Sequence, residues 1–207
     1  MKKIVLVLAL FALATGVYAQ AISLDLHAST FASRYFYLPG LGSVSTPSVA
    51  PSIGIVADMG NVDLLANVDF WLDIYNDKNY NDKTTYWILG IYAGVAPKLD
   101  MTERLTLTIP ILAKFIHGGI KYKDKTYSDE LKLGQNIFGL DLGGRAYYAL
   151  GQRASVWMGF QVAVLEFWPE ASIKVKSGGY SGSGKSGETD FYFFNGGTLD
   201  FGIKINF

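Results

Sequence analysis

Apolar and polar residues alternate with a period of two over most of this chain. The segment from Val62 to Tyr75 shows the pattern most clearly, because every second residue is apolar and three aspartates lie between them. Successive side chains of a β-strand point to opposite faces, whereas a helix would spread these aspartates around its circumference. The segment is therefore predicted to be a strand with one polar and one apolar face, the apolar face being Leu64, Ala66, Val68, Phe70, Leu72 and Ile74.

The same alternation recurs elsewhere, so that the chain is predicted to contain eight strands. The segments 105–116 and 199–207 are nearly as regular as the first one, and the others carry weaker versions of the pattern. The seven further segments are 22–27, 53–58, 86–95, 105–116, 138–145, 155–164 and 199–207. Pro110 interrupts one of them and cannot donate a ladder hydrogen bond, which predicts a bulge or an unpaired carbonyl facing the interior.

The connections between these strands alternate in length. Segments 60–61, 97–103 and 150–153 are short, whereas 39–51, 76–84, 117–131 and 169–189 are longer. An even number of antiparallel strands with short turns at one end and longer loops at the other is typical of a transmembrane β-barrel. Strands of about 9–11 residues cross a bilayer. The predicted fold is all-β, an eight-stranded antiparallel up-and-down transmembrane barrel with short periplasmic turns and long external loops.

The first 19 residues are predicted to be a cleaved signal peptide. Lys2 and Lys3 precede an uninterrupted apolar run, residues 4–14, and Val17 and Ala19 supply small residues before a cleavage site at Gln20. The run is too short for a membrane-spanning helix, which needs about 20 apolar residues. No cysteine follows the cleavage site to carry a lipid anchor. Residues 20–207 are expected to form one transmembrane barrel domain in the bacterial outer membrane.

Composition narrows the possible functions. The chain has 18 basic and 18 acidic residues, and removal of Lys2 and Lys3 leaves 16 basic residues and a net charge of −2. A nucleic-acid partner is not expected, because such proteins carry a basic stripe. With no cysteine and two histidines, the chain lacks the usual means of building a disulfide scaffold or a thiolate metal site. No cofactor, metal site or catalytic residue is predicted.

The mature chain resembles the small eight-stranded outer-membrane barrels of the OmpA, OmpX and OmpW type. The resemblance lies in the architecture of residues 20–207 and in the last strand, which alternates and ends on an aromatic residue. In that class such a strand is the signal that the barrel-assembly machinery reads, which makes this machinery and outer-membrane lipid the expected partners. The residues that match the signal here are Phe201, Ile203, Ile205 and Phe207.

Aromatic residues cluster where strands should meet the membrane interfaces. Such clusters form girdles around outer-membrane barrels. The clusters are Tyr35–Tyr37, Tyr86 with Trp87, Tyr147 with Tyr148, Phe167 with Trp168, and Phe191–Phe194.

The polar faces of the strands predict a charged lumen. Ionised groups inside a barrel must be paired or hydrated, and eight strands leave an interior barely wide enough for side chains. A network that fills the lumen is therefore expected, with a narrow cation path as the alternative. Its predicted members are Asp25, His27, Asp58, Asp63, Asp69, Asp73, Lys114, Asp141, Arg145, Asp200 and Lys204.

Three motifs resemble sites for phosphate binding, calcium binding or lipid deacylation, but each lacks the neighbouring residues or the position that its function needs. Residues 179–186 match the phosphate-binding loop pattern without a helix to follow it. Residues 77–82 begin like a calcium loop, but the glycine at position six is missing and Ile88 stands where a glutamate is needed. His27 and Ser29 resemble the pair of lipid-A-deacylating barrels, yet here they face the lumen near the N-terminus.

These features predict a non-enzymatic integral outer-membrane protein with a structural or surface-interaction role, whose loops contact an extracellular ligand. A narrow small-solute or cation channel is one alternative, and a lipid-modifying barrel enzyme is another. A soluble lipocalin-like carrier would need the apolar faces inside. The charges and glycines of the polar faces suit a lumen better than they suit a protein exterior.

Overall fold

The computed structural model describes residues 21–32, 35–38, 42–45, 48–77, 82–124, 126–186 and 189–207. The signal peptide prediction lies outside these residues. No helix able to span a membrane is found in the described part of the chain. The strands are β1 (Ala21–Ala32), β2 (Tyr35–Leu38), β3 (Gly42–Ser45), β4 (Ser48–Asp58), β5 (Val62–Asp77), β6 (Asp82–Asp100), β7 (Leu105–Thr108), β8 (Ile111–Asp124), β9 (Glu130–Ala149), β10 (Ala154–Trp168), β11 (Ala171–Ser177), β12 (Tyr180–Ser186), β13 (Asp190–Phe193) and β14 (Gly197–Asn206).

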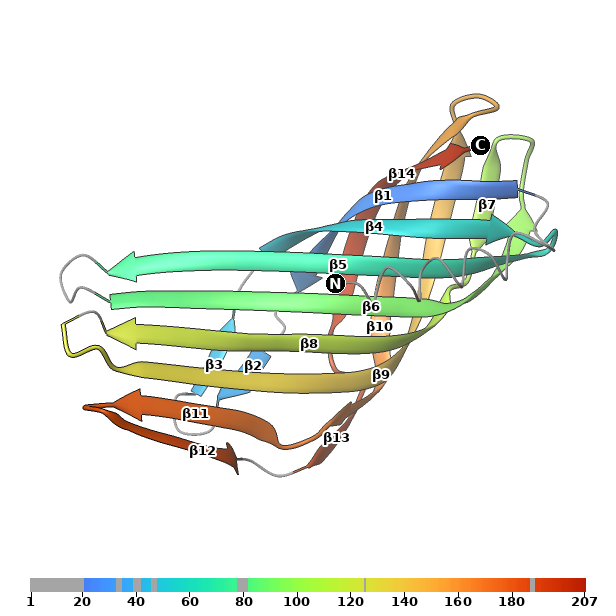
Figure 1. Ribbon diagram of the computed structural model, residues 1–207. Helices are drawn as coiled ribbons and strands as arrows, with labels where there is room; N and C mark the ends of the chain where they lie inside the picture. The colour runs from blue at the N-terminus through green and yellow to red at the C-terminus, as the bar shows by residue number, and fades with distance from the viewer. Residues whose placement is uncertain are drawn as a thin grey trace.

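Eight antiparallel strands close into a barrel, as the alternation predicts. The order around the wall is β1, β4, β5, β6, then β7 and β8 as one interrupted strand, β9, β10 and β14, which returns to β1 (Figure 1). Ten residue pairs join β14 to β1, from Ser23–Asn206 to Ala32–Gly197. Closure gives every strand of the barrel wall two neighbours, so that the wall has no open edge.

The two faces of the wall separate by polarity. Side chains on the same face of the wall as Asp25 and Arg145 point inward and are mostly buried. The opposite positions carry large apolar side chains that are about half exposed, among them Phe70 at 50%, Phe160 at 52% and Phe201 at 51%. The barrel therefore has its polar face inside and its apolar face outside, the reverse of a soluble protein.

Pro110 breaks the fifth strand without shifting it. The pairs Leu107–Ala146 before the break and Ile111–Leu142 after it keep the same register along β9. The proline ring is buried in the interior, and its carbonyl accepts the Gly143 amide at 2.9 Å. The predicted bulge is absent at this position, since the register is kept, and the carbonyl of Pro110 itself has a partner.

A bulge lies two strands further on, in β10. The pairing with β9 shifts between Ala163 and Leu165, so that Val164 is the extra residue. Because the side-chain period is two, one extra residue moves all following side chains to the other face. Glu166 and Trp168 consequently point into the barrel.

The long connections are largely strand, which corrects their prediction as loops. β5, β6 and β9 contain 16, 19 and 20 residues, well beyond the length needed to cross a bilayer. β11 adds to the outer part of β9, and β12 pairs with β11. Figure 1 shows these strands projecting past β1, β10 and β14. We call this projection the external wall, made of the outer parts of β5, β6, β8 and β9 together with β11 and β12. The prediction failed there because these segments are rich in Gly, Ser, Lys, Asp and Tyr, a composition typical of loops.

Candidate functional site

The lumen holds three separate groups of charged side chains. From the short-turn end outward they are centred on Lys98, Arg145 and Lys114. The predicted lumen residues divide among them as Asp58, Asp63 and Lys204 in the first, Asp25, His27 and Asp200 with Arg145 in the second, and Asp141 with Lys114 in the third. Asp69 is buried apart from these groups, where Ser52 donates to it. The side chain of Asp73 lies outside the described residues.

The first group closes the short-turn end of the barrel. Lys98 Nζ lies 2.6 Å from Asp58 Oδ1 and 3.2 Å from Asp63 Oδ1, which joins β4, β5 and β6. Asp58 also accepts the Gly60 amide at 2.8 Å, so that it holds the β4–β5 turn. The ammonium of Lys204 lies 4.8 Å from the centre of the Tyr147 ring.

The second group surrounds a fully buried arginine. Arg145 Nη1 lies 3.3 Å from Asp25 Oδ2, and the guanidinium stacks 4.3 Å from the centre of the Trp157 ring. Trp157 Nε1 donates to the other oxygen of Asp25 at 2.7 Å. His27 Nδ1 is 3.5 Å from Asp25. These contacts link β1, β9 and β10 across the lumen.

The third group is a buried cation between two carboxylates. Lys114 Nζ lies 2.5 Å from Asp141 Oδ1 and 2.6 Å from Glu166 Oε1. The second oxygen of Glu166 accepts the Trp168 Nε1 proton at 3.0 Å and the Asn195 amide at 2.6 Å. All three charged side chains are at least nine-tenths buried, so that each depends on these partners for its stability.

Two members of these groups escaped the sequence analysis. Glu166 was missed because the Val164 bulge reverses the alternation, and the adjacent apolar pair Val164 and Leu165 is the one trace of it in the sequence. Lys98 was assigned to a turn, whereas β6 continues to Asp100. Extending the alternation past Ala96 would have found it.

Side chains fill the lumen around these groups. Leu112, Val56, Leu65 and Tyr92 form one buried apolar cluster. A second cluster, Ile88, Ile116, Ile137 and Trp168, lies toward the external wall. Two cavities beside the charged groups have volumes of about 10 Å³ each, which is room for one water molecule.

The burial of Trp168 also corrects the predicted girdle. Trp168 and Tyr147 are 8% and 4% exposed and belong to the lumen. Their neighbours, Phe167 and Tyr148, take the outward positions, because adjacent strand residues face opposite ways. Tyr35–Tyr37 have no described side chains.

The outer face of the external wall carries a row of lysines. Lys121, Lys132 and Lys174 are opposite one another on β8, β9 and β11. Like charges directly opposite in a sheet destabilise it, so that this row costs stability unless an anion lies between the lysines. A hollow of about 340 Å³ adjoins the row and is lined by Glu130, Lys132, Lys174, Val175, Lys176, Ser181, Gly182 and Ser183.

One internal anion already lies among these lysines. Glu130 is 2.6 Å from Lys132 and 3.3 Å from Lys121, and the hydrogen bond from Lys132 is the main cause that lowers the pKa of Glu130. One carboxylate cannot neutralise all three lysines of the row, and Lys174 makes no ion pair among the described residues.

Nearer the outer end of the external wall, Tyr122 donates a hydrogen bond to Asp82. This bond is the main cause that raises the pKa of Tyr122 to about 12.

Two of the three motifs noted in the sequence lie on described strands. His27 and Ser29 are 8% and 4% exposed and face the lumen, as predicted. Residues 180–186 are a strand paired with β11. No group of three His, Asp or Glu side chains that could hold a metal ion occurs in the described parts of the chain. Most of the calcium-like segment lies outside the described residues.

Solved structures with the same fold are outer-membrane barrels. A major outer membrane protein of Thermus thermophilus is similar at a TM-score of 0.63, with 12% identity over 90% of this chain and 98% of that one. The attachment invasion locus protein Ail of Yersinia pestis, in complex with the heparin analogue sucrose octasulfate, is similar at 0.51, with 11% identity over 90% and 97%. No family model and no curated protein matches the sequence. The chain has the fold of the small outer-membrane barrels.

Proposed function

We propose that this protein is a non-conducting, non-enzymatic barrel of the bacterial outer membrane, whose external wall contacts ligands outside the cell. In this orientation the short turns face the periplasm and the external wall faces outward. The lumen network stabilises the barrel and blocks passage through it. The barrel-assembly machinery reads the last strand.

The apolar belt around the outside carries the proposal. Soluble monomers rarely expose contiguous apolar patches above a few hundred Å², whereas here every barrel strand presents apolar side chains outward. In a bilayer this surface is buried in hydrocarbon, and barrel closure leaves no unpaired strand edge in lipid. The outer-membrane barrels of the same fold support this location.

The filled lumen favours a plug over a channel. A conducting path needs a continuous wet bore, and the buried apolar cluster around Ile116 occupies part of the external half of this lumen. Lys114 and Arg145 are committed to buried ion pairs. In this proposal the charges of Lys114 and Arg145 stabilise the barrel and do not line an ion path.

The enzyme alternative rests on the pair His27 and Ser29, which the structure buries inside the barrel. A lipid substrate reaches the outside of the barrel, whereas His27 and Ser29 are buried inside. Replacement of His27 by Ala should leave lipid A unchanged, as analysed by mass spectrometry of extracted lipid. Loss of a lipid modification in that strain would restore the enzyme hypothesis.

The membrane proposal is tested by gel mobility and fractionation. Folded barrels resist detergent until heated, so that unheated and boiled samples should migrate differently, and the protein should sediment with outer membrane. A periplasmic soluble fraction with no heat-dependent shift would contradict the proposal.

A second candidate function, binding of an anionic glycan, is favoured by the lysine row. Three lysines lie opposite one another beside a hollow, and only Lys121 and Lys132 have an ion-pair partner among the described residues, the single carboxylate of Glu130. A sulfated or phosphorylated saccharide would neutralise them. Ail, which has the same fold, was crystallised with a heparin analogue.

We predict that the double variant Lys132→Gln/Lys174→Gln weakens binding to immobilised heparin at least about fivefold, because exposed charges contribute roughly 0.5 kcal/mol each. Binding of the wild type should fall as salt increases. Surface plasmon resonance in detergent measures both. The control Arg104→Gln/Arg153→Gln removes the same charge at the opposite end and should bind like the wild type. Equal weakening in both variants would indicate a nonspecific charge effect.

A further inference from the structure

The apolar belt contains a trough along β9. Large side chains cover most of the belt, but β9 contributes Gly144 and Ala146 at two successive outward positions. On one side Leu107 lies opposite Ala146, and on the other side Met158 lies opposite Ala146 and Phe160 opposite Gly144. The floor is thus lined by small residues and the two sides by large ones.

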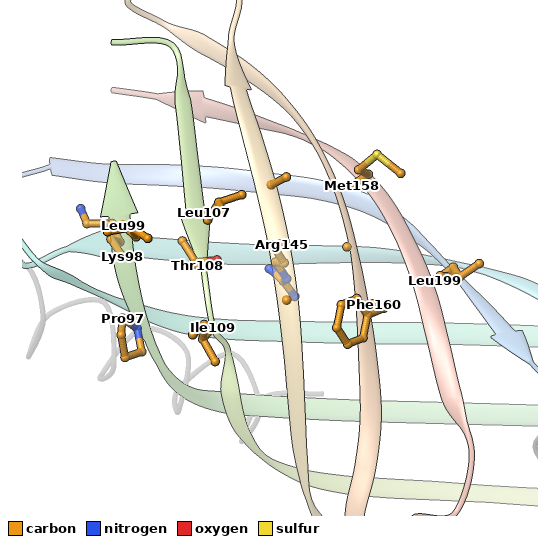
Figure 2. Close-up of a pocket in the computed structure, with 13 residues that line it drawn as sticks. Pro97, Lys98, Leu99, Leu107, Thr108, Ile109, Arg145, Met158, Phe160 and Leu199 are labelled. Atoms are coloured by element: carbon orange, nitrogen blue, oxygen red, sulfur yellow. The ribbon is translucent and has the colours of Figure 1, made fainter. Parts of the chain in front are cut away.

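The trough is a defined cavity with a definite length. Its volume is about 530 Å³, within the range of small-molecule sites. Figure 2 shows its side chains, with Leu99, Leu107 and Ile109 on one side of β9 and Met158 and Phe160 on the other. Tyr148 and Leu142 are the next outward residues of β9 and are 46% and 44% exposed, so that they bound the trough at its two ends.

Two arginines, Arg104 and Arg153, lie at the short-turn end of the trough. The carbonyl of Arg104 accepts the Ala149 amide at 2.8 Å, and the carbonyl of Ala154, the residue after Arg153, accepts the Leu150 amide at 2.9 Å. The two arginines therefore flank the end of β9. Both are exposed, and neither forms an ion pair with any residue that the structure describes. Arg104 is three residues from Leu107, about 10 Å along the strand.

We propose that this trough is a binding site for one phospholipid of the periplasmic leaflet. An acyl chain lies between Leu107 and Met158 over Ala146, and the phosphate meets Arg104 and Arg153 beyond Tyr148. The inference rests on the proposed membrane location, which places the short turns in the periplasm. The ligand class follows from the combination of an apolar trough inside the lipid-facing belt with unpaired cations at its end.

The test is native mass spectrometry of the detergent-purified barrel titrated with palmitoyl-oleoyl phosphatidylethanolamine. The wild type should retain one lipid. Ala146→Leu fills the trough from a lipid-facing position and should weaken retention at least about fivefold. The matched control is Ala93→Leu, an outward position on β6 that does not line the trough, and it should stay within about twofold of the wild type.

A second arm separates the headgroup from the chain. Arg104→Gln/Arg153→Gln should weaken retention of phosphatidylethanolamine and leave retention of the uncharged palmitoyl-oleoyl glycerol unchanged. Equal retention by wild type and Ala146→Leu would overturn the site, as would equal loss in Ala93→Leu, preferential retention of lipid A over phospholipid, or a dimer that Ala146→Leu converts to a lipid-free monomer.

The folded state of each variant is checked by its heat-dependent gel shift. A variant that keeps the shift and loses the lipid supports the trough. If the wild type itself lacked the shift, the membrane proposal would fail, whereas a wild type that shifts but retains no lipid contradicts the trough alone.

Discussion

Replacement of Lys114 by Met should lower the free energy of unfolding by about 3–5 kcal/mol, the cost of removing one partner from a buried ion pair. Asp141 and Glu166 both lie within 2.6 Å of the Lys114 ammonium. The substitution leaves two carboxylates buried beside one another without a cation, and methionine fills the space of the alkyl chain. Guanidinium titration in detergent, followed by tryptophan fluorescence, measures the loss.

A second substitution identifies the cause of this loss. Glu166→Gln on the Lys114→Met background removes one uncompensated charge, while the remaining amide oxygen still accepts from Trp168 and Asn195. We expect it to recover at least about 1 kcal/mol. The surface control Lys132→Met should change stability by less than about 0.5 kcal/mol. If Lys114→Met behaved like that control, the third group would have to be hydrated, contrary to its burial.

Replacement of Arg145 by Met should cost about 3–5 kcal/mol for a related reason. Arg145 is 2% exposed, and Asp25, its carboxylate partner, is 0% exposed. The variant leaves Asp25 with the Trp157 indole and His27, and it removes the guanidinium from the Trp157 ring. The same denaturant titration gives the stability, and Trp157 emission reports the changed contact.

Arg145→Lys separates charge from stacking. Lysine keeps the cation but lacks the planar guanidinium that contacts both Asp25 and Trp157, so that its loss should be smaller, about 1–2 kcal/mol. A Lys variant as unstable as the Met variant would mean that shape, and not charge, carries the effect of Arg145.

Where lipid imposes an apolar face, the sequence predicted the fold well. The alternation in residues 62–75 requires one side for hydrocarbon and one for the lumen, and β5 has this arrangement. Outside the membrane the constraint disappears. Lys121 and Lys132 face water from strands that were predicted as loop, although Ile120 and Leu133 beside them face the other way and pack together. This alternation was missed because it is short and lies among Gly, Lys, Asp and Tyr residues typical of a loop.

The lumen residues followed the same alternation, with Glu166 as an exception. Asp25, Lys114, Asp141 and Arg145 point inward because alternation fixes their side. Glu166 was missed because a single extra residue at Val164 reverses the faces of β10, and the adjacent apolar pair Val164 and Leu165 is the one trace of this bulge in the sequence. The grouping of the charges into three clusters was also beyond prediction, since it depends on which strands are neighbours and on their register.

Conductance across a planar bilayer tests the central claim, that a filled lumen makes this barrel a plug. Purified protein that shows the heat-dependent gel shift is added to the bilayer in salt solution, and current is recorded under an applied voltage. We expect no open-channel steps for the wild type, because the buried clusters and ion pairs leave no continuous bore. Stable steps that change in cation preference with Asp69→Asn or Lys114→Ala would contradict the claim and identify the lumen as an ion path.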